Sequence, residues 1–153
     1  MKRKIFIGIA VVLVVIQFFR IDKSEPESSP EADILLVESV PSDIGIILKT
    51  SCYDCHSNKT IYPWYSNVAP VSWWLKSHVN EGRKELNFSE WSTYSDRRKD
   101  HKLEEINELV SEDEMPLASY LWVHGEARLS NEEKDQLINW VNTLRKGEKI
   151  ENK

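Results

Sequence analysis

The feature that most constrains this chain of 153 residues is Cys52-Tyr53-Asp54-Cys55-His56, which contains both of its cysteines. Two cysteines three positions apart, with a histidine directly after the second, are typical of a c-type haem attachment site. Both thiols can reach the vinyl groups on one edge of a porphyrin and form thioethers, and the imidazole of His56 can then bind the iron. The motif therefore predicts a small domain folded around one covalent haem c, held by Cys52 and Cys55.

Other uses of a cysteine pair fit the sequence less well. A disulfide between them would close a very small loop and stabilise little, and a thioredoxin-type dithiol belongs in a βαβ context that is not visible here. A structural zinc site needs four ligands. Two of His78, His101 and His124 could complete such a site, although these histidines lack a paired spacing. A structural zinc module therefore stays as the less favoured alternative.

The net charge of the chain indicates which kind of partner it can bind. Beyond residue 20 the chain carries sixteen Lys and Arg against twenty-five Asp and Glu, a net charge of −9. Nucleic acid needs a basic surface, so this balance argues against nucleic acid as a partner. It favours a soluble body that meets a redox partner protein through a basic patch on that partner.

Residues 1–21 are predicted to be a transmembrane signal-anchor helix. Lys2-Arg3-Lys4 precedes an apolar run over 5–19, and a positive flank is typical of the cytoplasmic end of an anchor. The run is short for a span, which needs about 20 residues, but Arg20 can snorkel. A cleaved signal peptide is the alternative, although the run ends without a small-x-small cleavage pattern. We therefore expect a single pass through the inner (cytoplasmic) membrane, with the remainder in the periplasm or on the outside face.

The rest of the chain divides into three parts. Residues 22–40 are rich in Pro, Ser and Glu and are predicted to be a solvated linker, with a short extended piece at 34–37. Residues 41–147 are predicted to be the haem-binding domain, and 148–153 a C-terminal tail.

Within the domain, the first predicted helix begins after Pro41 and leads into the haem motif. Gly45 in this helix would let another helix approach closely. A second helix is predicted to begin at residues 70–72.

A third, amphipathic helix is predicted over 96–114. A capping box at Ser130 and Glu133 starts the last helix. Because no convincing strand is found, the pattern predicts an all-α, cytochrome-c-like small helical domain around one haem.

The second axial position of the iron has few candidates. Met115 is the only methionine besides the initiator, and Pro116 follows it. A lone methionine usually fills core space, but His/Met ligation is a standard cytochrome c arrangement, so the metal ligands are predicted to be His56 and Met115. His78, on the apolar face of its helix, is a buried hydrogen-bonded residue, a haem-edge contact or a competing ligand.

Aromatic residues at 62–74 are either ordinary core or the walls of a porphyrin pocket, since flat rings exclude water from a haem. Trp64, Tyr65, Trp73 and Trp74 are the pocket candidates. Arg83 is the candidate partner of a haem propionate.

Further blocks of sequence accompany the attachment motif in a fixed order. They are Cys52-Tyr53-Asp54-Cys55-His56-Ser57-Asn58, Tyr62-Pro63-Trp64-Tyr65, Ala69-Pro70-Val71-Ser72-Trp73-Trp74, His78-Val79-Asn80-Glu81-Gly82-Arg83, Leu86-Asn87-Phe88-Ser89-Glu90-Trp91 and Glu114-Met115-Pro116-Leu117. Together they resemble the bacterial haem-binding domain family of cytochrome-c-like proteins, over roughly residues 40–145. The resemblance implies a single covalent c-type haem, an all-α cytochrome-c-like fold and a location in the cell envelope, but no particular reaction.

These features predict a membrane-anchored, periplasm-facing c-type cytochrome that transfers single electrons. Neither a substrate pocket nor an acid/base pair can be identified, so an enzyme is not expected. The alternative is a haem-based gas sensor or peroxidase, in which Met115 is labile or does not bind the iron.

Overall fold

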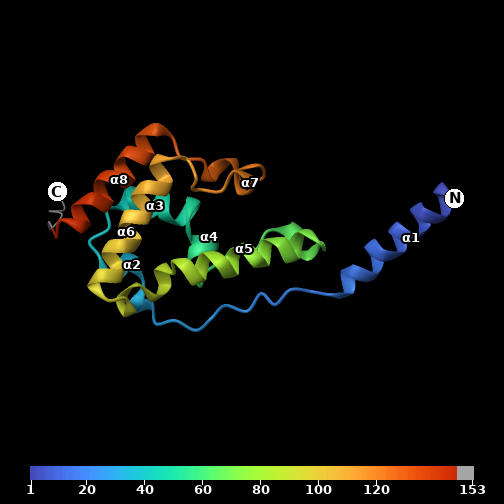
Figure 1. Ribbon diagram of the computed structural model, residues 1–153. Helices are drawn as coiled ribbons and strands as arrows, with labels where there is room; N and C mark the ends of the chain where they lie inside the picture. Colours follow the sequence, from blue (N-terminus) through green and yellow to red (C-terminus); the bar gives the residue numbers. More distant parts are fainter. Residues whose placement is uncertain (148–153) are drawn as a thin grey trace.

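The computed structural model describes residues 1–147, and its regular elements are helices (Figure 1). The longer helices are α1 (Lys2–Val15), α3 (Ser42–Ser51), α5 (Val71–Glu85), α6 (Asp96–Ser111) and α8 (Asn131–Arg145). Single turns of α-helix are α2 (Ile34–Val37), α4 (Tyr53–His56) and α7 (Ala118–Leu121), and 3-10 turns are η1 (Ile16–Phe18), η2 (Pro30–Ala32), η3 (Trp64–Asn67), η4 (Phe88–Thr93) and η5 (Gly125–Ala127). Since residues 1–147 contain no strand, the all-α prediction is confirmed.

Side-chain caps start the two helices that pack along each other. The predicted capping box is present at α8, where the Glu133 N–H donates to Ser130 Oγ at 3.2 Å and the Ser130 N–H donates to the Glu133 carboxylate at 2.8 Å. Ser95 caps α6 in the same way by accepting from the Arg98 N–H. These bonds satisfy N–H groups that a helix leaves unpaired at its first turn.

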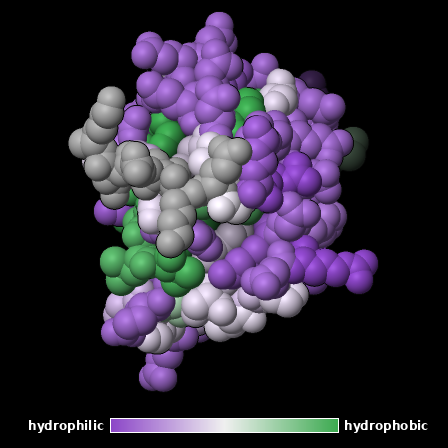
Figure 2. Space-filling model, turned by 90° about the vertical axis from the view of Figure 1, so that its left-hand side faces the viewer, coloured by the Kyte–Doolittle hydropathy of each residue, from purple (hydrophilic) through white to green (hydrophobic). Residues whose placement is uncertain are grey.

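The core lies where α3, η4, α6 and α8 meet. Figure 1 shows α6 and α8 side by side, with α3 crossing next to them. Its largest fully buried side chains include Trp91, Phe88, Leu48 and Leu137. The outer faces of α6 and α8 are polar, and the face at that end of the molecule is mainly hydrophilic (Figure 2). Burial of the apolar stripes therefore brings these helices together.

The transmembrane prediction for residues 1–21 is wrong. Helix α1 ends at Val15, and in residues 1–147 there is no helix with both the length and the apolar character needed to cross a membrane. Its 14 residues rise about 21 Å, against a hydrocarbon core of about 30 Å. The apolar run continues in sequence, but its backbone changes to the 3-10 turn η1 and then bends at Phe19.

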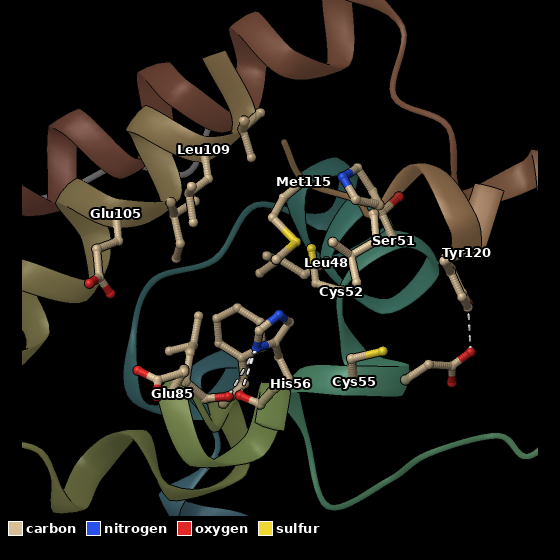
Figure 3. Close-up of a pocket in the computed structure, with 18 of the residues that line it drawn as sticks. Leu48, Ser51, Cys52, Cys55, His56, Glu85, Glu105, Leu109, Met115 and Tyr120 are labelled. Atoms are coloured by element: carbon tan, nitrogen blue, oxygen red, sulfur yellow. Dashed lines mark hydrogen bonds between the residues drawn. The ribbon is translucent and has the colours of Figure 1, made fainter. Parts of the chain in front are cut away.

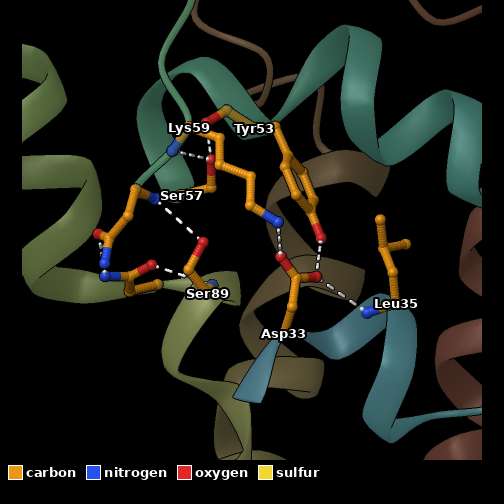
Figure 4. A network of polar contacts seen from close by, with 8 residues as sticks. Asp33, Leu35, Tyr53, Ser57, Lys59 and Ser89 are labelled. Atoms are coloured by element: carbon orange, nitrogen blue, oxygen red, sulfur yellow. Dashed lines mark hydrogen bonds and ion pairs between the residues drawn. The ribbon is translucent and has the colours of Figure 1, made fainter. Parts of the chain in front are cut away.

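The folded body begins earlier than residue 41. Pro30 starts η2, and the 34–37 piece is a turn of helix instead of an extended segment. Ile34 is fully buried in the core. Asp33 is buried too, and it accepts hydrogen bonds from Tyr53 Oη at 2.6 Å and Lys59 Nζ at 2.9 Å (Figure 4). The second half of the predicted linker is thus held by one apolar side chain and one buried carboxylate. The predicted tail, 148–153, lies outside the described residues.

Candidate functional site

A cavity of about 470 Å³ opens between α3, α4, α5, α6 and the segment from Met115 to α7. Most of its wall is apolar. The apolar side chains are Leu48, Leu86, Phe88, Ile106, Leu109, Val110, Leu117 and Leu129. Polar groups make up the smaller part of the wall, an arrangement typical of small-molecule and cofactor sites.

The attachment motif lies on this wall. Helix α3 ends at Ser51, and Cys52 leaves helical geometry with φ −126° before the single turn α4 begins. This break places Cys52, Cys55 and His56 together on the cavity. Both cysteines are free thiols. Burial raises the pKa of Cys52 to about 12 and that of Cys55 to about 11, so both are neutral thiols at neutral pH.

The imidazole of His56 is oriented by helix α5. Its Nδ1 lies 3.0 Å from the Gly82 carbonyl oxygen and 3.1 Å from that of Leu86. Two carbonyl acceptors require a proton on Nδ1, so Nε2 carries the lone pair. Burial lowers the pKa of His56, and the two hydrogen bonds raise it by a smaller amount. A neutral ring with one fixed N–H and one free nitrogen is the state that binds a metal.

Gly82 allows this approach. A Cβ built on Gly82 would lie 2.6 Å from the Cys55 carbonyl oxygen, which is closer than real Cβ contacts. By contrast, a Cβ on Gly45 would meet Leu35 at 3.8 Å, an ordinary contact. The close helix approach that the sequence predicted at Gly45 therefore occurs at Gly82, where α5 lies against α4.

Met115 lies across the cavity from His56. Figure 3 shows the Met115 side chain reaching in from the segment after α6, while the His56 ring rises from the opposite wall. The N–H of Met115 donates to the Leu109 carbonyl at 3.1 Å, which ties this segment to the end of α6. His78 also lines the cavity, but it lies one turn before Gly82 on α5 and therefore on the same wall as His56.

Asp54, between the two cysteines, connects the motif to its surroundings. It accepts from Tyr120 Oη of α7 at 2.8 Å and from the Ile61 N–H at 2.9 Å. Burial, followed by the bond to Asp54, raises the pKa of Tyr120. Tyr120 also stacks on His124, with ring centroids 4.3 Å apart. These contacts hold α7 beside the attachment motif.

The four aromatic pocket candidates do not line the cavity, which corrects the prediction. Trp64 is 78% exposed, and Tyr65 Oη bonds to His124 Nε2 at 2.7 Å. Trp73 Nε1 donates to the Phe19 carbonyl at 2.9 Å, and Trp74 lies against His78 with its ring centroid 4.3 Å away. These rings belong to η3 and the first turn of α5, and none of them lines the cavity.

Arg83 is also outside the cavity wall. Its Nε donates to the Ser57 carbonyl at 2.7 Å and an Nη donates to Thr60 Oγ1 at 2.8 Å. The guanidinium therefore holds the chain that follows α4, and it is not placed to meet a propionate. These two bonds hold the guanidinium against the segment that follows α4 and keep it off the cavity wall.

Sequence reasoning missed most of the wall. Ile106 and Leu109 of α6 line the cavity, although this helix was predicted only to be amphipathic. Lys102, Glu85 and Glu105 also line it. The available signal was the apolar stripe of α6, whose members include Ile106 and Leu109.

The zinc alternative finds no support in the structure. Within residues 1–147, no three side chains of His, Cys, Asp and Glu gather where they could hold a metal ion. His78, His101 and His124 do not converge on the cysteines, and His101 instead pairs with Glu105 at 3.3 Å.

The residues present fit a haem. Two thiols, one oriented imidazole and one thioether enter a cavity whose remaining wall is mostly apolar, and this donor set is typical of haem-binding proteins. The chain belongs to the haem-binding domain family, whose model matches residues 11–143. Comparison with curated proteins and with solved structures gave no match.

Proposed function

We propose that the protein is a c-type cytochrome that carries one covalent haem on Cys52 and Cys55 and transfers single electrons. The observation that supports this most directly is that both thiols, His56 and Met115 enter one apolar cavity. When bound, haem supplies an iron that accepts and releases one electron. We propose no enzymatic activity.

His56, Met115 and the apolar wall have separate roles in the proposed haem site. His56 would hold the iron through Nε2, and its Nδ1–H bonds to Gly82 and Leu86 keep the ring from turning. Met115 would hold the iron through its sulfur from the opposite wall, and pairing a histidine with a methionine raises the reduction potential relative to two histidines. The apolar wall excludes water, which limits solvent reorganisation when the charge changes.

We further propose that the protein works outside the cytoplasm, in the periplasm or on the outer face, and exchanges electrons with a partner protein. The net charge of −9 beyond residue 20 supports a partner with a basic surface patch and disfavours nucleic acid.

The test is the optical spectrum and intact mass of the purified full-length chain. We expect the mass of one haem to remain attached after denaturation, because thioethers survive it. Each single variant, Cys52→Ser or Cys55→Ser, should lose one of the two thioether bonds. The double variant should lose both and release its haem on denaturation. Haem that is fully extracted by denaturation from the unaltered protein would refute the covalent assignment.

Carbon monoxide tests the electron-transfer role. A reduced iron with His56 and Met115 both bound has no free position, so we expect the spectrum to stay unchanged in carbon monoxide at neutral pH. Met115→Ala is the control, since it opens the sixth position and should bind the gas. Rapid binding by the unaltered protein would refute the electron-transfer assignment and favour a sensor or peroxidase.

A further inference from the structure

The two ends of the cavity differ in chemistry. A haem held by thioethers at its vinyl edge carries its two propionates on the opposite edge. Figure 3 shows Cys55 and Tyr120 at one end of the cavity and Glu85 and Glu105 at the other. The propionates of a haem attached to Cys52 and Cys55 would therefore lie near the end of the cavity that holds Glu85 and Glu105.

Lys102 of α6 stands at this far end. Among the residues that the structure describes, it is the one Lys or Arg that lines the cavity. Its side chain is 9% exposed, and its Nζ lies 2.6 Å from Glu105 Oε2 and 3.8 Å from Glu85 Oε2. A buried ammonium is costly unless anions surround it. The position therefore favours negative groups.

The ammonium of Lys102 has capacity for another acceptor. It has three N–H donors, and within residues 1–147 it donates one hydrogen bond, to Glu105. Glu85 is close enough for an ion pair but not for a hydrogen bond. Both carboxylates reach toward solvent, with Glu85 59% and Glu105 37% exposed. They can turn outward, whereas Lys102 cannot leave the cavity wall without exposing its buried stem.

We infer that Lys102 is the propionate-binding residue of the haem site and that Glu85 and Glu105 are the anions that compete with the propionates for it. This assignment rests on the proposed covalent haem at Cys52 and Cys55, and it gives Lys102 the role that the sequence suggested for Arg83. The two glutamates hold the ammonium in place at the cavity wall, and a propionate then shares or replaces their contact.

The test uses the haem-loaded full chain and reads the propionate bending band by resonance Raman spectroscopy, together with the reduction potential. Lys102→Met should move the band to lower frequency, because the propionate loses its donor. It should also lower the ratio of reduced to oxidised protein at a fixed ambient potential about tenfold. For a one-electron couple, this change corresponds to a fall of about 59 mV in the reduction potential. Lys102→Arg should restore both values.

Two further variants keep the test decisive. Glu105→Gln frees Lys102 for the propionate, so the band should move to higher frequency and the potential should rise. Lys84→Met removes the same charge from an exposed position of α5, where the side chain is 72% exposed, and should leave the band unchanged. An unmoved band in Lys102→Met overturns the inference. If Lys102→Met takes up no haem, an unmoved band in Glu105→Gln overturns it instead.

The outcome also separates this inference from the proposed function. If the unaltered chain carries no covalent haem, the proposed function fails and the role of Lys102 fails with it. If the unaltered chain carries the haem with its axial ligands and the propionate bending band is the same in Lys102→Met, only the role of Lys102 fails.

Discussion

Replacing Gly82 by alanine should disturb the site by forcing α5 away from α4. Gly82 is in helix α5, and the added Cβ would lie 2.6 Å from the Cys55 carbonyl oxygen and 3.1 Å from the Cys55 carbonyl carbon and Cβ. These are mostly backbone atoms of the attachment motif, so they cannot rotate away. The helices α4 and α5 must separate, and His56 Nδ1 must lengthen its bonds to Gly82 and Leu86.

The size of the effect follows from three contributions. Inserting a methyl group into a tight contact costs about 2 kcal/mol. Weakening one net hydrogen bond of His56 adds about 1 kcal/mol, and the better helix propensity of alanine returns about 1 kcal/mol. We therefore expect Gly82→Ala to lower the free energy of unfolding by about 2 kcal/mol.

The matched control is Gly45→Ala in α3. A Cβ there would meet Leu35 at 3.8 Å and Val40 at 4.0 Å, which are ordinary contacts. The propensity gain remains without the clash, so this variant should be more stable than the unaltered protein by about 1 kcal/mol. The two alanine variants should thus differ by about 3 kcal/mol.

Urea unfolding of the haem-loaded protein, followed by far-ultraviolet circular dichroism, measures both values. With a slope of about 2 kcal/mol per molar urea, the midpoints of the two variants should lie about 1.5 M apart. Gly82→Ala should also perturb the visible spectrum, because His56 is displaced, whereas Gly45→Ala should not. A Gly82→Ala protein as stable as the unaltered one would refute the close packing of α5 on the attachment motif.

Three further predictions concern single side chains. Met115→Ala should abolish the long-wavelength absorption band of an iron–thioether bond in the oxidised protein and lower its reduction potential; an unchanged band would exclude Met115 as ligand. Tyr53→Phe removes a hydrogen bond to the buried Asp33 carboxylate. It should lower the free energy of unfolding, measured with urea, by about 2 kcal/mol. A decrease below the measurement error would show that the bond from Lys59 is enough to satisfy Asp33. Burial and the bonds to Asp33 and Asp54 raise the pKa values of Tyr53 and Tyr120 in the folded protein. The contribution of the two protonated hydroxyls to the free energy of unfolding is therefore complete below the ordinary tyrosine pKa of about 10, and it is lost as pH rises from there toward the raised pKa values. The ultraviolet absorbance of tyrosinate should therefore show both hydroxyls ionising only on unfolding, and ionisation of all five tyrosines near pH 10 in the folded protein would contradict this.

Local signals in the sequence predicted the helices well. The capping box at Ser130 and the helix start after Pro41 depend on neighbouring residues, so they are visible without the fold. The apolar run near the N-terminus was misleading for the same reason. Its composition is that of an anchor, but the helix within it stops at Val15.

The cavity wall could not be predicted in this way. Trp64 and Trp73 are aromatic and near the motif in sequence, yet they lie on other surfaces. Lys102 and Ile106 are about fifty residues from the motif and line the same cavity. An aromatic or a charged residue carries no local sign of what it will face, because that depends on which helices pack together.

The sequence by itself determined the helical class of the domain and the Cys52–His56 motif that indicates a haem, because cap, stripe and motif are encoded within a few neighbouring positions. Only the tertiary structure decided which carbonyls orient His56, that Met115 lies opposite it, and that Lys102 is the cation of the cavity wall. Those relations join residues 26 to 59 positions apart, from His56 and Gly82 to His56 and Met115, and they exist because a glycine without a Cβ lets α5 lie against α4 and because buried apolar stripes bring α6 over the site.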